Sequence, residues 1–209
     1  MATNISVASQ ALLLLRANTI SSFSEASNEA EICNIMYEEH IKQLLSIYPW
    51  TFATKKAQLN QDSTDPIGEY TYSHIVPAEA LLIWALFTSD DIGANPVNDY
   101  DIYGDTTGAL RRIYSNHEAL YADYTIYIPE NNWPPYFAQF AINSFASYIA
   151  IPVTGKADLA DYYERKAYGS PSANRKGGLF GVAVSTDSKQ KRNEYVVSSP
   201  LVDARFGGA

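Results

Sequence analysis

The chain has 209 residues, of which 46% are hydrophobic and 18% are charged, and its formal net charge is −8. That length suits one compact domain, or one domain with an extended arm. The acidic balance argues against a protein that binds nucleic acid over its whole surface, and the single cysteine excludes an internal disulfide. The scarcity of charge and the 16 tyrosines fit a surface covered by neighbouring subunits, although a tyrosine-rich monomer has the same composition.

The charge is divided unevenly along the chain. Residues 1–164 contain 7 Lys and Arg against 20 Asp and Glu, a net charge of −13, whereas residues 165–209 contain 8 against 3, a net charge of +5. The acidic body would repel DNA. The basic tail has three interpretations: docking on an acidic protein, contact with nucleic acid, or simple solvation. Its interleaved apolar residues favour a protein surface, because neutralising phosphates requires only the charges.

Two helices are expected before residue 50. The first covers residues 5–17, and its apolar side chains extend almost around the helix, which predicts burial on most sides. The second covers residues 28–48, with Asn28 as its N-cap and Glu31 at capping-box spacing. Pro49 ends this helix, because it cannot continue the backbone hydrogen bonds.

Residues 50–130 are expected to form a small antiparallel β portion. A strand over residues 50–60 would bring Trp50 and Phe52 to the same face by period-two alternation. The continuous apolar run Leu81–Phe87 is consistent with a buried strand. Further strand candidates are Tyr70–Tyr72 and Tyr124–Ile128, and a hairpin is expected from Tyr100–Tyr103 and Leu110–Tyr114.

The acidic hairpin sequence DYDIYGD suggests a calcium loop at first sight. An EF-hand that begins at Asp99 requires a ligand at its fifth position and a glutamate at its twelfth. Those positions carry Tyr103 and Leu110. A solvated hairpin tip is therefore the preferred interpretation of Asp99, Asp101 and Asp105.

Two more helices and a tail complete the chain. The third helix covers residues 135–151, begins at Pro134 and Pro135, where proline loses no hydrogen bond, and ends at Pro152. The fourth covers residues 156–168. Residues 1–170 are thus expected to form one α+β domain, with a bundle of about four helices and the inserted β portion. Residues 171–209 show no helical period and are expected to form an extended C-terminal arm that a partner would order.

No arrangement of residues indicates catalysis, a cofactor or a metal. Cys33 falls on the apolar face of its helix and is expected in the core, whereas His40 falls on the polar flank and is expected at the surface. His74 and His117 share no ligand spacing with His40. The chain also lacks a nucleophile elbow and a phosphate loop. An unrecognised hydrolase that uses Cys33 or His40 is the weakest of the interpretations kept open.

Aromatic residues at periodic positions usually fill a core. We expect core packing, with packing between subunits as the alternative, for the following large side chains: Leu12, Leu15, Trp50, Phe52, Phe140 and Phe145.

Several segments between residues 5 and 170 resemble a known family. They are LLLLRANTISSF, LLSIYPW followed by TFATKKAQL, EYTYSHIVPAEALLIWAL, and WPPYFAQFAINSFASYIAIPVT. This pattern resembles the tail tubular protein A family, the head-to-tail adaptors of short-tailed bacteriophages. The resemblance implies a virion protein that forms a ring, with twelve copies as in the family, between the portal and the tail nozzle. Double-stranded DNA would pass through the lumen without specific binding, and no membrane is involved.

The resemblance places the helices in the ring wall and the β portion toward the nozzle. The nozzle-facing residues expected on this basis are Tyr100, Tyr103 and Asp105. The basic tail leads to a separate hypothesis, that an arm docks on the portal through Arg175, Lys176, Phe180, Lys189, Lys191, Arg192, Tyr195, Val196, Val197, Arg205 and Phe206. The alternative function is that of a nucleic-acid-binding accessory protein that acts through the same basic tail.

Overall fold

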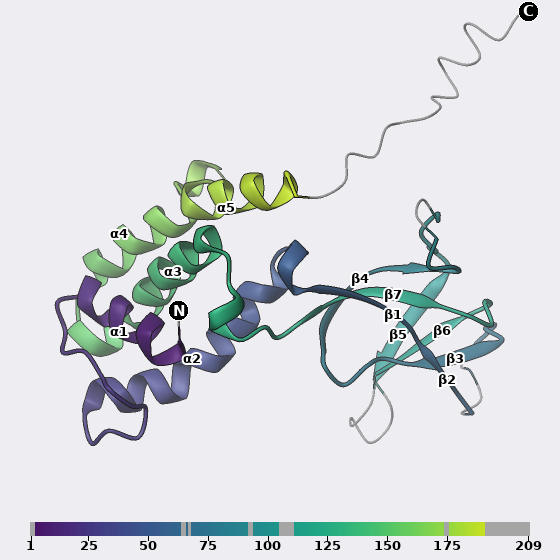
Figure 1. Cartoon of the computed structure of the whole chain (residues 1–209), viewed down its shortest axis with the longest axis horizontal. Coiled ribbons are helices and arrows are strands. Elements are labelled where there is room, and N and C mark those ends of the chain that lie inside the picture. The colour runs from purple at the N-terminus through teal and green to yellow at the C-terminus, as the bar shows by residue number, and fades with distance from the viewer. Residues whose placement is uncertain are drawn as a thin grey trace, which may run out of the picture.

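The molecule is elongated, with helices at one end and β-strands at the other (Figure 1). This computed structural model describes residues 3–63, 66, 68–91, 94–104, 111–173 and 176–190. Within these residues the chain forms five α-helices and two antiparallel sheets, which confirms the α+β class. The helices are α1 (Asn4–Leu14), α2 (Asn28–Ser46), α3 (Pro135–Thr154), α4 (Ala157–Tyr168) and α5 (Gly178–Ser188).

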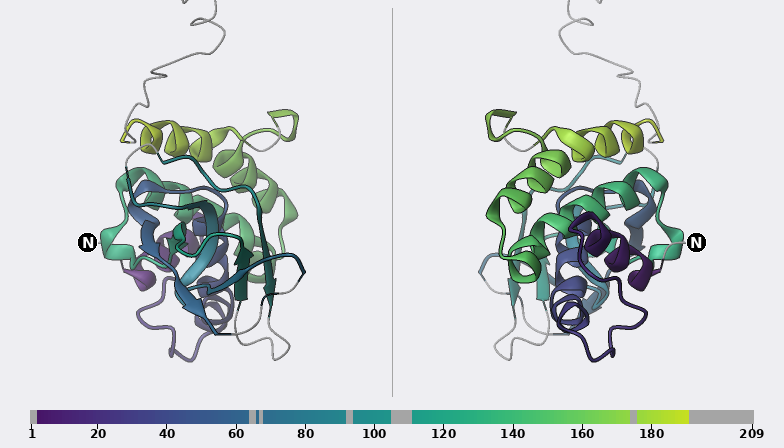
Figure 2. Two further views of the ribbon diagram at one scale, coloured as in Figure 1. Left: turned by 90° about the vertical axis from the view of Figure 1, so that its right-hand side faces the viewer. Right: turned by 90° about the vertical axis from the view of Figure 1, so that its left-hand side faces the viewer.

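Helix α3 is the centre of the helical half. It contacts each of the other helices, which lie around it in the end-on view of Figure 2. Its buried side is almost continuous and includes Phe137, Phe140, Phe145 and Ile149. Small residues such as Ala141 and Ala146 allow the neighbouring helices to approach closely.

The β half consists of two small sheets. The first has the strand order β1-β7-β4 and the second has the order β2-β3-β6-β5. The strands are β1 (Thr54–Gln58), β2 (Asn60–Asp62), β3 (Tyr72–Ile75), β4 (Ala80–Phe87), β5 (Tyr100–Gly104), β6 (Arg111–Ser115) and β7 (Tyr121–Ile126). A second hydrophobic core, separate from that of the helices, includes Leu86, Ile113 and Leu120. The expected hairpin is confirmed, since β5 and β6 pair in an antiparallel register.

The strands expected over residues 50–60 and Leu81–Phe87 correspond to β1 and β4, and both expectations need correction. The strand does not begin at Trp50: Thr51–Ala53 is a 3-10 turn (η1), and β1 begins at Thr54. Trp50 is nevertheless fully buried, because its indole donates to the carbonyl oxygen of Leu44 at 3.0 Å and packs among aromatic rings. The run at β4 is a strand, but it is only partly buried because it lies at the edge of its sheet.

Local chemistry explains where the helices differ from expectation. The N-cap of α2 is Ser27 rather than Asn28: Ser27 is extended and its hydroxyl accepts from the amide of Ala30. Pro152 does not end α3, which continues to Thr154 and ends at Gly155 in the left-handed region. A proline in the last turn removes only one backbone donor there, so the helix tolerates it.

Burial around the first helix is less complete than the sequence suggested. Leu12 and Leu15 are buried as expected, but Leu13 is 64% exposed and lies on the outer side of α1. In α4, Tyr163 and Ala167 are buried, whereas Tyr162 is 59% exposed. The helical half therefore keeps large apolar side chains on its surface.

The start of the expected arm is a packed helix. Helix α5 contacts α3 and α4, and it buries Ala183 and Asp187. Its chain direction is set by Gly178, which has φ of +57° and lies so close to α4 that a Cβ atom would be 2.6 Å from the carbonyl oxygen of Lys166. Residues 178–188 are therefore not the extended, partner-dependent segment that the sequence suggested.

Candidate functional site

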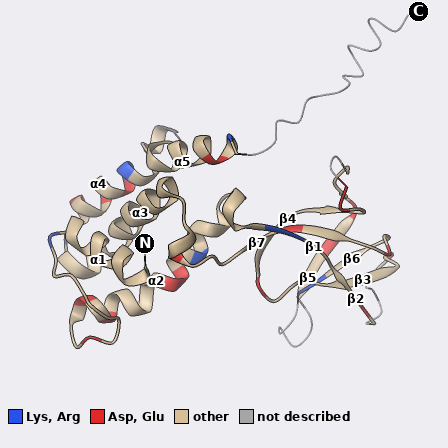
Figure 3. Ribbon diagram, in the orientation of Figure 1, with Lys and Arg blue, Asp and Glu red and all other residues tan. Residues whose placement is uncertain are grey.

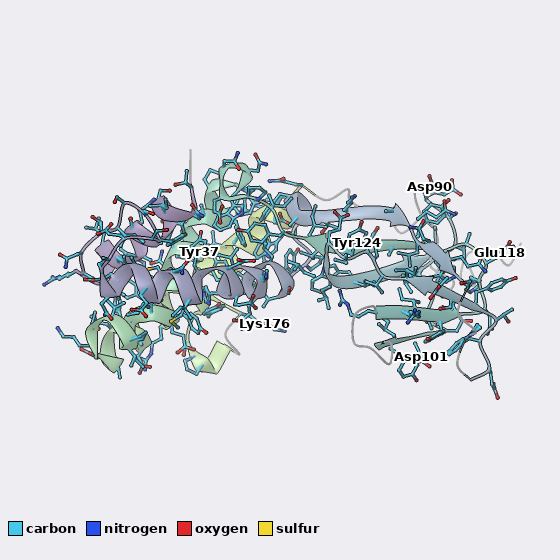
Figure 4. The ribbon with its side chains drawn as sticks, turned by 90° about the horizontal axis from the view of Figure 1, so that it is seen from below. Tyr37, Asp90, Asp101, Glu118, Tyr124 and Lys176 are labelled. Atoms are coloured by element: carbon cyan, nitrogen blue, oxygen red, sulfur yellow. The ribbon has the colours of Figure 1, made fainter. Side chains whose placement is uncertain are left out.

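A groove runs between α2 and α4, with α3 as its floor and the start of α5 at one end. Its cavity volume is about 630 Å³, within the range of ligand pockets. Helix α2 contributes His40 and Gln43, and Ile47 follows at its C-terminal end. Lys176, which is labelled in Figure 4, comes from the segment before α5 and also lines the groove. The remaining lining residues are Ser144, Ser147, Tyr148, Ala160, Glu164, Tyr168 and Phe180.

A chain of buried polar groups forms the floor of the groove. The Nε2 atom of His40 lies 3.0 Å from the hydroxyl oxygen of Ser144. That oxygen lies 2.8 Å from the hydroxyl oxygen of Tyr168. The Tyr148 ring stacks on the His40 imidazole, with ring centroids 4.6 Å apart and an interplanar angle of 17°. Three helices, α2, α3 and α4, thus meet through one imidazole and two hydroxyls.

The position of His40 contradicts the expected surface histidine. Its side chain is buried, with 6% exposure, because the helix turns this residue toward α3. Burial lowers the pKa of the imidazole to about 4, so the ring is neutral near pH 7. The Nδ1 atom is buried and has no hydrogen-bond partner among the described residues. Such an atom is a place where a bound molecule could supply the missing partner.

The His40–Ser144 pair has the distance of a base and its nucleophile, but its surroundings do not suit catalysis. Ser144 is fully buried, so a substrate could not reach its hydroxyl. No carboxylate among the described residues bonds the Nδ1 atom of His40, and an orienting group at that position is what a catalytic imidazole needs. The geometry supports a binding surface.

The expected core residues belong to the hydrophobic core of the helical half. Trp50, Phe140 and Phe145 are fully buried, and Phe52 packs against the same cluster. The Trp50 and Phe137 rings meet edge to face at 5.0 Å. In the described chain these aromatic side chains pack in the core.

Asp187 joins three segments that are distant in sequence. Its carboxylate is fully buried and accepts from the Thr51 amide and from the Thr51 hydroxyl, at 3.0 Å and 2.7 Å. It also accepts from the Tyr136 hydroxyl at 2.8 Å. Burial and this hydrogen bond raise the pKa of Tyr136 to about 12. The end of α5 is thus fixed to η1 and to the start of α3.

A second buried carboxylate lies where α3 is approached from the β half. Glu130 accepts from the hydroxyls of Tyr37, at 3.1 Å, and Tyr127, at 2.9 Å. Burial raises the pKa of both tyrosines, and the neighbouring carboxylate adds to the effect. Both phenols therefore stay protonated as donors, which fixes the linker between β7 and α3 on the side of α2.

Two of the expected nozzle-facing residues, Tyr100 and Tyr103, lie on β5, in the half of the molecule away from the helices. Tyr100 is half-buried, and Tyr103, which packs on Tyr114 with ring centroids 5.9 Å apart, is exposed. Asp105 lies outside the described residues. Strand β5 is at the edge of its sheet, and a nozzle contact through Tyr100 and Tyr103 remains a prediction.

Three of the expected portal-docking residues lie in the described chain. Lys176 and Lys189 are exposed, but Phe180 packs against Phe140 and Trp50, so it belongs to the fold of this chain. The others lie outside the described residues: Arg175, Lys191, Arg192, Tyr195, Val196, Val197, Arg205 and Phe206.

The remaining candidate ligands do not converge. Cys33 is buried as expected, and burial raises the pKa of its thiol to about 11. In the β half, Nε2 of His74 lies 3.0 Å from the carbonyl oxygen of His117, and His117 lies 3.4 Å from Asp99. Nowhere in the described chain do three His, Cys, Asp or Glu side chains group as metal ligands.

Sequence reasoning missed the groove because its residues come from separate helices. One signal was present: Asn143, Ser144 and Ser147 interrupt an otherwise apolar helix. Small polar residues in a buried helix need partners, and here the partner of Ser144 is the imidazole of His40.

Comparison of the chain with protein-family models and with curated proteins gives no match. No helix among the described residues is long and apolar enough to span a membrane.

Proposed function

We propose that the chain is a structural subunit of a bacteriophage tail, a head-to-tail adaptor that closes into a ring between the portal and the nozzle. The similarity of its segments to the tail tubular protein A family is the origin of this proposal. The most specific of these segments, YPWTFATKKAQL, includes Trp50 at the junction of the helical and β halves.

The observation that carries the proposal is the apolar surface of the helical half. Large apolar side chains are exposed on every described helix: Leu13 on α1, Ile35 on α2, Tyr148 and Ile151 on α3, Tyr162 on α4 and Val182 on α5. Because the other four helices pack around α3, their outer faces look in different directions. A ring needs two different patches on each subunit, since its contacts are head to tail.

Charge on α2 suits a channel for DNA. The helix and the loop before it carry Glu25, Glu29, Glu31, Glu38 and Glu39, and Figure 3 shows the acidic residues in this region. A wall with the same sign of charge as DNA lacks the attraction that phosphate contacts create. DNA would therefore slide past such a wall without being held.

Electron microscopy of the full chain, mixed with the portal of the virus that encodes it, tests the proposal. We expect rings stacked coaxially on the portal. Ile35→Arg and Tyr162→Arg each place a charge at one exposed apolar side chain, and Glu118→Arg, at an exposed position of the β half, is the control for a charge change alone. A virion map that places the protein away from the junction of head and tail would overturn the proposal.

The portal contact needs its own variant. Removing residues 175–209 would also remove α5 and its bonds to Thr51, so the deletion should begin after Gln190. If the arm docks on the portal, deletion of residues 191–209 abolishes portal binding and leaves the far-ultraviolet circular dichroism of the fold unchanged. Salt-dependent retention of DNA by the isolated protein, lost in the same deletion, would favour the nucleic-acid-binding alternative.

A further inference from the structure

The groove between α2 and α4 has apolar walls with no described covering. Ile47 and Tyr148 are both exposed there, and Tyr148 retains 48% of its accessible surface although it stacks on His40. Phe180 closes one end and is only partly buried. These apolar side chains form a surface that another segment can cover.

The groove is close to neutral. Its charged lining residues are one carboxylate, Glu164, and one ammonium group, Lys176, while His40 is neutral near pH 7. The remaining polar groups are hydroxyls and the amide of Gln43. A surface of this kind suits an uncharged stretch of peptide with aliphatic or aromatic side chains. It does not suit nucleic acid, which requires concentrated positive charge.

We propose that residues 195–202 of the same chain occupy this groove. Their sequence, YVVSSPLV, is uncharged and lies between Glu194 and Asp203. Two adjacent valines favour an extended backbone, and Pro200 disfavours a helix. The segment therefore presents apolar side chains and free backbone amides in the form that a shallow groove can bind.

The length of the chain fits this position. Helix α5 begins at the groove, where Phe180 lines it, and from Phe180 to Ser188 it rises about 12 Å at 1.5 Å per residue. Four or five extended residues, at about 3.3 Å each, cover the return distance of about 15 Å from Gln190. Residues 191–194, the polar run KRNE, would pass along the exposed side of α5. Tyr195 is then the first apolar residue to arrive at the groove.

The chemistry of the floor matches an inserted peptide. The helical rise from His40 to Ile47 is about 10 Å, which accommodates three or four extended residues. Apolar side chains of the segment would pack on Ile47, Tyr148 and Phe180. The hydroxyl groups and the Gln43 amide that line the groove can bond to the backbone of a segment that lies between its walls.

This docking does not depend on the proposed function. The same residues cannot occupy the groove and a portal surface at once, so an arm that meets the portal must first leave its groove. The inference concerns the free subunit and is tested without a portal.

Hydrogen exchange of the full chain provides the test. In the wild-type protein we expect the amides of residues 195–202 to exchange at least about tenfold more slowly than those of an unstructured peptide. Gln43→Arg places a long cation in the groove from an exposed position, and it should return these amides to the unprotected rate. Asn34→Arg adds the same charge on an exposed part of α2 outside the groove, and it should leave the protection unchanged. Unprotected amides in the wild-type chain would overturn the proposal.

Disulfide trapping separates docking within one chain from docking between chains. In a Cys33→Ser background, Gln43→Cys combined with Val197→Cys should form a cross-linked monomer, because a disulfide requires Cα atoms within about 7 Å. Asn34→Cys combined with Val197→Cys is the matched control and should not cross-link. Cross-linked dimers, or equal cross-linking of the two pairs, would refute docking of the segment in the groove of its own chain.

Discussion

Acidification should destabilise the protein through His40. The folded protein holds the pKa of this imidazole at about 4, whereas the ordinary value is 6.5. Between these values the unfolded chain binds a proton that the folded chain does not, so stability is complete above pH 6.5 and is lost as the pH falls toward 4. The full difference corresponds to about 3 kcal/mol, and about 2 kcal/mol should already be lost at pH 5.

The assay is urea unfolding of the full chain at pH 7.5 and pH 5, followed by tryptophan fluorescence, because Trp50 and Trp133 are buried. His40→Gln can keep a hydrogen bond to Ser144 and cannot titrate, so its loss of stability between the two pH values should be smaller than that of the wild type by about 2 kcal/mol. His74→Gln is the matched control. Burial also lowers the pKa of His74, so this variant should lack only the part of the pH-dependent loss of stability that His74 causes and should keep the part that His40 causes. Equal pH-dependent losses in the wild type and His40→Gln would refute the reasoning.

Three further outcomes follow from the geometry. Asp187→Ala should lower the free energy of unfolding by about 3 kcal/mol, because the donors of Thr51 and Tyr136 lose their buried acceptor. Urea titration measures this loss of stability. An effect as small as that of a surface substitution would contradict the prediction. Gly178→Ala should cost more than about 1 kcal/mol, since its positive φ and the 2.6 Å approach leave no room for a Cβ atom; Gly104→Ala, where nothing lies within 4 Å, is the control in the same thermal unfolding experiment. The Cys33 thiol should react with a thiol reagent at pH 8 only after unfolding, because burial raises its pKa to about 11; rapid labelling of the native protein would show that the thiol is accessible.

The spacing of apolar residues predicted which segments form helices, but it did not predict the residues at which those helices end. The apolar stripes of α2, α3 and α4 identify these helices because their pattern repeats over several turns. The end of α3 depends on Gly155 rather than on Pro152, and either residue could have stopped it. The N-cap of α2 is Ser27, because the backbone is extended at that residue. Serine and asparagine are both good N-cap residues, so the sequence does not show which of Ser27 and Asn28 takes this position.

Helix α5 and the groove depend on tertiary contacts. LFGVAV contains Gly181 and has no polar side to alternate with its apolar residues, so its sequence does not indicate a helix. The helix is stabilised by Phe180 and Ala183 against α3 and α4, and by Asp187 against η1. His40 was misplaced because the position of α3 decides which flank of α2 is buried.

The interleaving of the two halves along the chain has a consequence for synthesis on the ribosome. Strands β1 to β7 come from one uninterrupted stretch, whereas α1 and α2 precede it and α3 follows it. The β half can therefore fold as soon as it emerges, while α1 and α2 wait without the helix on which they pack. During that interval chaperones can bind the exposed apolar sides of α1 and α2. Once translation has passed Thr154, α3 can cover these sides, and the chaperones should dissociate.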